Sequence, residues 1–134
     1  MSLMNEGTDG RIARILVIED DEIMNSMIVQ LLSEAGYEAE GSENGSRGLA
    51  LLEKKAFDLI VTDIIMPEKE GLETIFAIRK KSKTLPIIAI SGGGKLGPEQ
   101  YLHLAKHFGA EFTFQKPFHN DLFLNAVRRC ISGL

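Results

Sequence analysis

Short apolar runs alternate with longer amphipathic stretches along the chain, beginning at Arg14. Three runs are continuous and rich in β-branched residues, which is typical of strands covered on both faces of a sheet. They are residues 15–18, 59–61 and 87–90. Two further runs, residues 37–40 and 111–115, alternate polar and apolar positions. Alternation predicts half-solvated strands, so we expect these two at the edges of the sheet.

The stretches between the strands carry apolar residues at helical spacing. In the first stretch, apolar positions recur at residues 23, 24, 27, 28, 31 and 32, and Gly36 follows where a glycine cap is expected. The other predicted helices centre on residues 49–52, 72–79, 98–108 and 123–131. Repeated strand–helix units with these inner and outer strands predict an α/β fold, a doubly wound parallel sheet of strand order 2-1-3-4-5.

Length and composition fit one domain. The chain has 134 residues, of which 44% are hydrophobic and 25% charged, as in an ordinary soluble globular domain. We expect residues 1–11 to form a disordered leader and residues 12–134 to form the domain. No apolar run approaches the ~18 residues that a membrane helix needs. The single Cys excludes an internal disulfide and fits a reducing compartment, so we expect a cytoplasmic location.

The charge balance argues against nucleic-acid binding by this domain. The sequence has 15 Lys and Arg residues against 19 Asp and Glu residues, which gives a formal net charge of −4. A mildly acidic domain lacks the basic surface of a nucleic-acid binder. Any effect on DNA would therefore act through a partner or a second domain.

Polar side chains follow four of the predicted strands. They are Glu19 and Asp20 after the first strand, Asp63 after the third, Ser91 after the fourth and Lys116 after the fifth. Ligands of parallel sheets bind outside the carboxyl ends of the strands, so we expect these side chains at one edge. Crowded carboxylates repel one another unless a cation joins them. Mg²⁺ takes such oxygen ligands, and an aspartate so placed can act as a nucleophile toward phosphorus.

Each of these residues, taken alone, has an ordinary explanation as a turn residue, a cap or a surface lysine. Asp63 is the hardest to explain in that way, because it lies between an apolar strand and Ile64-Ile65-Met66, where a charge costs energy. One polar feature at the end of each of four strands favours a shared function. Asp21 is expected to cap the first helix, and we leave it out of the site.

These segments together resemble the receiver domains of response regulators, over nearly the whole chain from about Ile12. The ordered set is specific to that family, whereas no single segment is. The segments are Ile15-Leu16-Val17-Ile18-Glu19-Asp20-Asp21, Phe57-Asp58-Leu59-Ile60-Val61-Thr62-Asp63-Ile64-Ile65-Met66-Pro67, Ile87-Ile88-Ala89-Ile90-Ser91-Gly92 and Lys116-Pro117-Phe118.

The resemblance implies a single (βα)5 receiver domain in which Asp63 is the phosphoacceptor. It implies that Glu19, Asp20 and Asp63 hold Mg²⁺, together with the backbone carbonyl of Ile65. Ser91 would bond the phosphoryl group, and Lys116 would be its cationic partner. The family's Lys–Pro bond is usually cis, so the bond from Lys116 to Pro117 is expected to be cis as well.

The resemblance also implies partners. The phosphoryl donor would be a phosphohistidine on a sensor histidine kinase or a phosphotransfer protein. Phosphorylation would change the affinity for an output protein that the sequence does not identify, and no direct contact with nucleic acid or membrane is expected. Such a domain is not an enzyme acting on a separate substrate, but it promotes its own phosphorylation and dephosphorylation. It would act alone or as part of a larger protein.

The sequence departs from the family pattern near two strand ends. Thr113 stands three residues before Lys116, where the family usually has a switch aromatic, and Ser91 is followed by three glycines. Ile65 and Gly93 occupy positions that influence phosphoryl lifetime in the family. Neither offers a polar side chain to orient an attacking water, so we hypothesise slow dephosphorylation.

Some residues suggest other functions. Thr113 raises the alternative of a pseudo-receiver that binds partners constitutively. The run Gly92-x-Gly94-x-x-Gly97 matches a dinucleotide-binding fingerprint, but it follows the fourth strand and leaves Asp63 unexplained.

We expect Cys130 to be a buried thiol, and we expect the charge run of residues 79–83 to be a solvated helix end.

Overall fold

Five parallel strands form one sheet in this computed structural model, which describes residues 11–64, 71–92, 103, 105–107 and 109–133. The strands are β1 (Arg14–Ile18), β2 (Glu38–Ser42), β3 (Leu59–Asp63), β4 (Ile87–Ser91) and β5 (Phe112–Gln115). The helices are α1 (Glu22–Glu34), α2 (Gly45–Lys54), α3 (Gly71–Lys81) and α5 (Asn120–Ser132). The strand order is β2-β1-β3-β4-β5, so the predicted order and the two predicted edge strands are confirmed.

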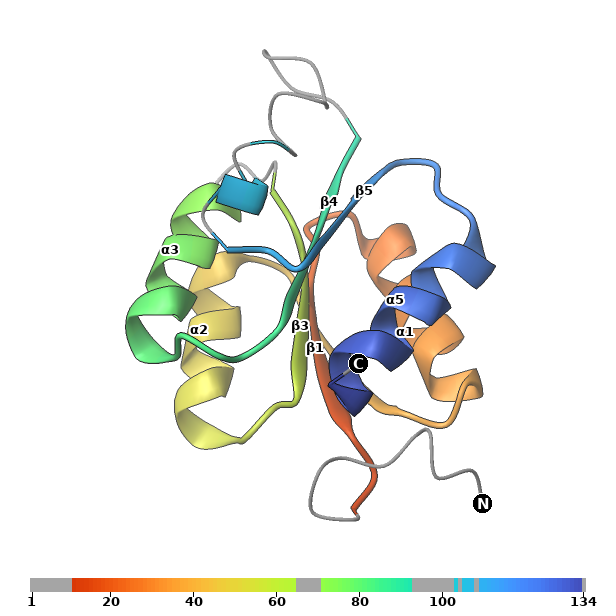
Figure 1. Cartoon of the computed structure of the whole chain (residues 1–134), viewed down its shortest axis with the longest axis horizontal. Helices are drawn as coiled ribbons and strands as arrows, with labels where there is room; N and C mark the ends of the chain where they lie inside the picture. The colour runs from red at the N-terminus through yellow and green to blue at the C-terminus, as the bar shows by residue number, and fades with distance from the viewer. Residues whose placement is uncertain (1–10, 65–70, 93–102, 104, 108, 134) are drawn as a thin grey trace.

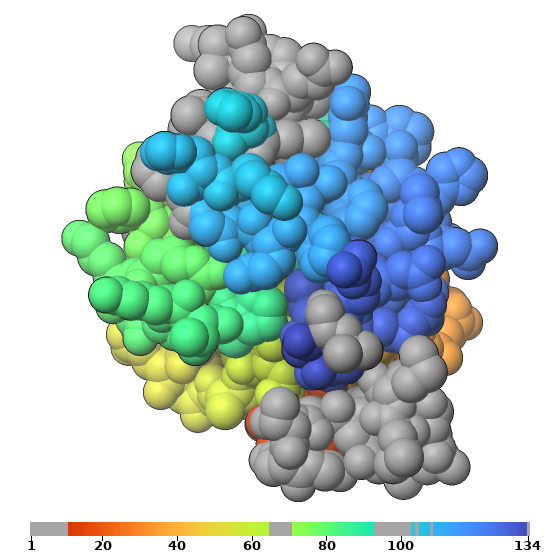
Figure 2. All heavy atoms as spheres, in the orientation of Figure 1, coloured from red at the N-terminus to blue at the C-terminus, as the bar shows by residue number. Residues whose placement is uncertain are grey.

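Helices cover both faces of the sheet, with α1 and α5 on one side and α2 and α3 on the other (Figure 1). The inner strands are apolar throughout because both of their faces are buried. In β1, Ile15 and Val17 belong to the core beneath α1 and α5, whereas Leu16 and Ile18 belong to the opposite core. Figure 2 shows the face on which the side chains of α3, β5 and α5 gather.

Several expectations fall outside the described residues. They include most of the leader, most of the helix predicted from Pro98, the Ile65 carbonyl and the glycines that follow Gly92. Of that helix, residues 103 and 105–107 are helical, and Ala105 is fully buried. Arg11, which we assigned to the leader, pairs with Asp58 at 3.0 Å. Among the described residues, no helix is long and apolar enough to span a membrane.

The apolar stripe predicted for α1 is only partly buried. Ile28 and Leu32 pack against the sheet, whereas Ile23 and Met27 are 74% and 60% exposed. Met27 precedes Ile28 by one residue, which turns its side chain about 100° round the helix axis. Spacing alone does not separate a buried stripe from an apolar stripe that faces solvent.

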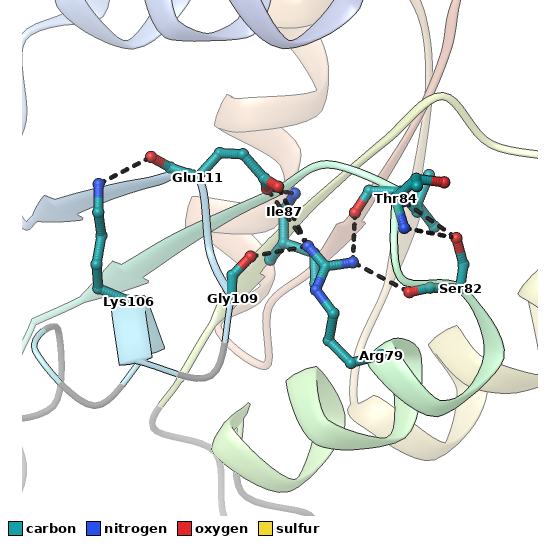
Figure 3. Close-up of polar contacts among 8 residues, drawn as sticks. Arg79, Ser82, Thr84, Ile87, Lys106, Gly109 and Glu111 are labelled. Atoms are coloured by element: carbon teal, nitrogen blue, oxygen red, sulfur yellow. Dashed lines mark hydrogen bonds and ion pairs between the residues drawn. The ribbon is translucent and has the colours of Figure 1, made fainter.

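The solvated helix end predicted for the charge run is wrong for Arg79, whose side chain is only 16% exposed. Its Nη1 donates to the carbonyls of Ser82 at 3.2 Å and Leu85 at 2.7 Å. Its Nη2 donates to the carbonyl of Gly109 at 2.8 Å and to the Glu111 carboxylate at 3.3 Å (Figure 3). One guanidinium therefore joins the end of α3 to the segments that enter β4 and β5.

Replacing this guanidinium is expected to destabilise the fold. Arg79→Met leaves three part-buried carbonyls without their donor, and we expect a loss of about 2–4 kcal/mol in the free energy of unfolding. Urea denaturation followed by circular dichroism measures this loss. The control is Lys83→Met, which changes an exposed residue close by in the sequence. Equal stability of the two variants would contradict the bridging role of Arg79.

Candidate functional site

The carboxyl ends of the parallel strands bring the predicted residues together. Glu19 follows β1, Asp63 ends β3, Ser91 ends β4 and Lys116 follows β5. The pairing of β3 with β4 places Asp63 opposite Ile90, the residue before Ser91. The backbone N–H of Lys116 donates to the carbonyl of Ser91 at 2.8 Å, which aligns the ends of β4 and β5.

Lys116 joins two buried carboxylates. Its Nζ donates to Oε1 of Glu19 at 2.6 Å and to Oδ2 of Asp63 at 2.8 Å. The side chains of Glu19 and Asp63 are 2% and 6% exposed, and that of Lys116 is 18% exposed. The exposed Asp20 adds a third carboxylate to this cluster.

Burial perturbs the titration of both partners in the Glu19–Lys116 pair. It raises the pKa of Glu19 to about 7, and the nearby Asp63 charge adds to this rise while the hydrogen bond from Lys116 opposes it. Burial alone would lower the pKa of Lys116. The hydrogen bonds to Asp63 and Glu19 outweigh it, so the pKa of Lys116 is raised and the amine stays protonated at neutral pH.

The donor set fits a hard divalent cation. Glu19, Asp20 and Asp63 each offer one carboxylate oxygen, and these oxygens lie within 4.8 Å of one another. Mg²⁺ prefers oxygen ligands, commonly one or two carboxylates with waters. A groove of about 740 Å³ between α1, β2 and α2 is lined by Glu19 and Asp20.

The Ser91 hydroxyl is buried, and none of the described residues bonds to it. Its Oγ has no hydrogen-bond partner among the described residues, and the residue is 0% exposed. A buried hydroxyl without a partner costs free energy, so its presence at a strand end needs a reason. An oxygen-rich ligand attached at the neighbouring strand end would supply the missing acceptor.

The turn between β1 and α1 holds the acidic pair in place. The Asp21 carboxylate accepts hydrogen bonds from the N–H groups of Ile23 at 3.0 Å and Met24 at 3.1 Å, as predicted for a helix cap. The N–H of Asp21 itself donates to Oε2 of Glu19 at 3.2 Å. The Asp21 side chain therefore caps α1, while its backbone N–H orients the Glu19 carboxylate.

Sequence reasoning missed Asn25, a polar residue of α1. Its side-chain amide donates to the carbonyls of Glu19 and Ser42, each at 3.0 Å. A polar residue on the inner side of the first helix, next to the expected site, was the available signal. The helical periodicity identifies only apolar positions, and Asn25 is not one of them.

Two further expectations concern the β5 end of the site. The peptide bond between Lys116 and Pro117 is cis, as expected. Thr113 pairs with Ala89 of β4, and its neighbours Phe112 and Phe114 pack against the core beneath α1 and α5. Because side chains alternate along a strand, neither phenylalanine occupies the face of Thr113.

Cys130, which we expected to be a buried thiol, is half-buried in α5. Burial raises its pKa to about 12, with a further rise from the Glu111 charge. The thiol is therefore protonated at neutral pH, and a nucleophilic role is not supported.

Proteins of similar sequence and of similar structure include a transcriptional regulatory protein and a receiver domain protein. A probable transcriptional regulatory protein of Picosynechococcus sp. is 34% identical over 128 residues, with 88% of this chain covered. The chain covers only 50% of that relative's length. A CheY-like receiver domain protein of Methanospirillum hungatei superposes with a TM-score of 0.82 at 26% identity, and the match covers 90% of this chain and 94% of that one.

A structure with a bound group is also similar. The response regulator TrrA of Thermotoga maritima, solved in complex with Mg²⁺ and beryllofluoride, has a TM-score of 0.78 at 31% identity. The match covers 89% of this chain and 99% of that one. The family model of the response regulator receiver domain matches residues 15–128, which contain all five strands except Arg14, the first residue of β1. The chain therefore belongs to the response regulator receiver domain family.

Proposed function

We propose that this receiver domain accepts a phosphoryl group on Asp63 in the presence of Mg²⁺ and thereby changes its affinity for a partner protein. The observation that carries the proposal is the Asp63 carboxylate, 6% exposed and 2.8 Å from the Lys116 amine, in a cluster of three acids. A structural carboxylate at this burial would be matched by its cation. Among the described residues, three clustered acids outnumber the Lys116 cation, which favours a reactive site over a structural ion pair.

The proposed reaction is a displacement at phosphorus. An Asp63 carboxylate oxygen attacks the phosphorus of a phosphohistidine, a P–O bond forms, and the P–N bond to the imidazole breaks. The imidazole leaves with the electron pair of that bond and takes up a proton. The product is an aspartyl phosphate, a mixed anhydride that keeps the energy of the phosphoryl bond.

The residues around Asp63 suit this transfer. Lys116 would move its hydrogen bond from the carboxylate to a phosphoryl oxygen, and the Ser91 hydroxyl would donate to another. Glu19, Asp20 and Asp63, with the Ile65 backbone carbonyl, would hold Mg²⁺. When bound, Mg²⁺ supplies positive charge to the phosphoryl oxygens in a transfer that depends on charge neutralisation.

Two exposed apolar residues of α1 suit a protein phosphodonor. Ile23 and Met27 lie one helical turn apart on α1, close in the chain to Asp20. We propose that they contact the phosphohistidine-bearing helices of a sensor kinase or phosphotransfer protein. Phosphorylation would then be read by an output protein that contacts the surface near β5 and α5.

The alternative is a pseudo-receiver, motivated by Thr113, that binds its partner without phosphorylation. The close Glu19–Lys116–Asp63 set and the buried Ser91 hydroxyl argue against it. A pseudo-receiver would not need two buried acids and a buried hydroxyl at neighbouring strand ends.

Acetyl phosphate and Mg²⁺ are expected to add one phosphoryl group to the protein, measured by intact mass. Asp63→Asn and a metal-free sample should show no adduct, whereas Asp121→Asn, which changes an exposed acid of α5, should behave like the wild type. An adduct that persists in Asp63→Asn would contradict the proposal. So would the absence of any adduct with acetyl phosphate and with a panel of sensor kinases.

Removal of the Lys116 charge is expected to destabilise the protein and to make it respond to metal. Lys116→Met leaves two buried carboxylates without their shared cation, and we expect a loss of about 3 kcal/mol in the free energy of unfolding. Added Mg²⁺ should recover part of the loss in urea denaturation. Lys55→Met breaks an exposed pair with Glu40 and should cost at most about 1 kcal/mol. If both variants lose the same stability, the account of the Lys116 charge is wrong.

The phosphorylated protein is expected to lose its phosphoryl group slowly, because Ile65 and Gly93 bring no polar side chain to orient water. The decay is measured by intact mass after removal of the phosphodonor. Ile65→Asn supplies an amide at one of these positions and should shorten the lifetime. A wild-type half-life of seconds would refute the hypothesis.

A further inference from the structure

The Asn25 side chain joins the ends of two neighbouring strands. From α1, its Nδ2 donates to the carbonyl of Glu19, just after β1, and to the carbonyl of Ser42, the last residue of β2. Both distances are 3.0 Å. The backbone N–H of Glu19 donates to the same Ser42 carbonyl at 3.0 Å, so Asn25 reinforces a contact between these strand ends.

The carbonyl that Asn25 holds belongs to the peptide unit between Glu19 and Asp20. This unit is planar, so fixing its oxygen also fixes the direction in which the chain continues to Asp20. The direction matters because the two acids diverge: Glu19 is buried and Asp20 is exposed. Both nevertheless offer an oxygen to the same cluster with Asp63, within 4.8 Å.

Gly41 gives a second, independent indication that the fold leaves room for the Asn25 side chain. A Cβ atom built on Gly41 of β2 would overlap Oδ1 of Asn25 and lie 3.0 Å from its Cγ. Gly41 is not among the described glycines with positive φ, so its backbone conformation suits any residue. The missing side chain at residue 41, rather than an unusual turn, is therefore what leaves room for Asn25.

From these contacts we propose that Asn25 is a positioning residue for the acidic cluster. Its amide orients the peptide unit between Glu19 and Asp20 and so sets how tightly the cluster binds a divalent cation, although Asn25 need not touch the cation. The proposal rests on the function proposed above. Groups that orient metal ligands in this way are typically worth about 10-fold to 100-fold in metal affinity.

The test is Mg²⁺ titration by isothermal calorimetry on the wild type, Asn25→Ala, Gly41→Ala and the double variant. Asn25→Ala should weaken Mg²⁺ binding by about 10-fold or more. Gly41→Ala changes no polar group, but it should weaken binding as well, because its methyl group displaces the Asn25 amide. The double variant should bind no more weakly than Asn25→Ala, since the methyl group then fills vacated space.

Two controls separate positioning from stability. Arg79→Met removes a polar network at the opposite end of the sheet and should lower stability without changing Mg²⁺ affinity. Ser26→Ala changes an exposed neighbour of Asn25 and should change neither. Circular dichroism and urea denaturation identify the variants that remain folded, and Gly41→Ala provides a second route to the same result if Asn25→Ala does not fold.

The possible failures are distinguishable. If the wild type gives no Mg²⁺ binding, the proposed function fails, and the role of Asn25 fails with it. If the wild type binds Mg²⁺ and Asn25→Ala binds within twofold of it, only the role of Asn25 is overturned. Independent, additive losses in the double variant would likewise overturn the link between Gly41 and Asn25.

Discussion

A single ammonium group between two buried carboxylates is the interaction on which the site depends. Glu19 and Asp63 lie at the ends of different strands with carboxylate oxygens within 4.8 Å, and their charges would repel without Lys116. The parallel sheet is what brings them together, because strands that run the same way end at the same edge. Among the described residues, the fold therefore gathers three carboxylates and the Lys116 amine at one edge, and the proposed binding of a cation and a phosphoryl group rests on this arrangement.

At each end of the sheet, one cationic side chain bonds several acceptors, but the two side chains differ in role. At the amino end of β4, the Arg79 guanidinium is shared among backbone carbonyls and the Glu111 carboxylate, so its charge is fully used in structure (Figure 3). At the carboxyl end, the Lys116 amine is shared between Glu19, which also lines the groove between α1, β2 and α2, and Asp63. Arginine fixes a planar arrangement of acceptors, whereas the compact lysine amine can turn toward a new acceptor.

The fold and the positions of the site residues could be predicted because both follow from strand order. Continuous apolar runs identified β1, β3 and β4, and their order fixed which polar residues share an edge. The burial of Arg79 and the exposure of Ile23 could not be predicted, since periodicity describes spacing within a helix and not which neighbours cover it. Asn25 was missed for a related reason: its partners are backbone carbonyls, which any residue type supplies and no motif records.

The measurement that tests the central claim most directly is a crystal structure of the protein with Mg²⁺ and beryllofluoride, a mimic of the phosphoryl group. The account predicts beryllium bonded to a carboxylate oxygen of Asp63, with the Ser91 hydroxyl and the Lys116 amine each donating to a fluorine. It also predicts Mg²⁺ held by the carboxylates of Glu19, Asp20 and Asp63. Beryllofluoride on another carboxylate, or Lys116 unmoved between Glu19 and Asp63 beside a bound beryllofluoride, would contradict it.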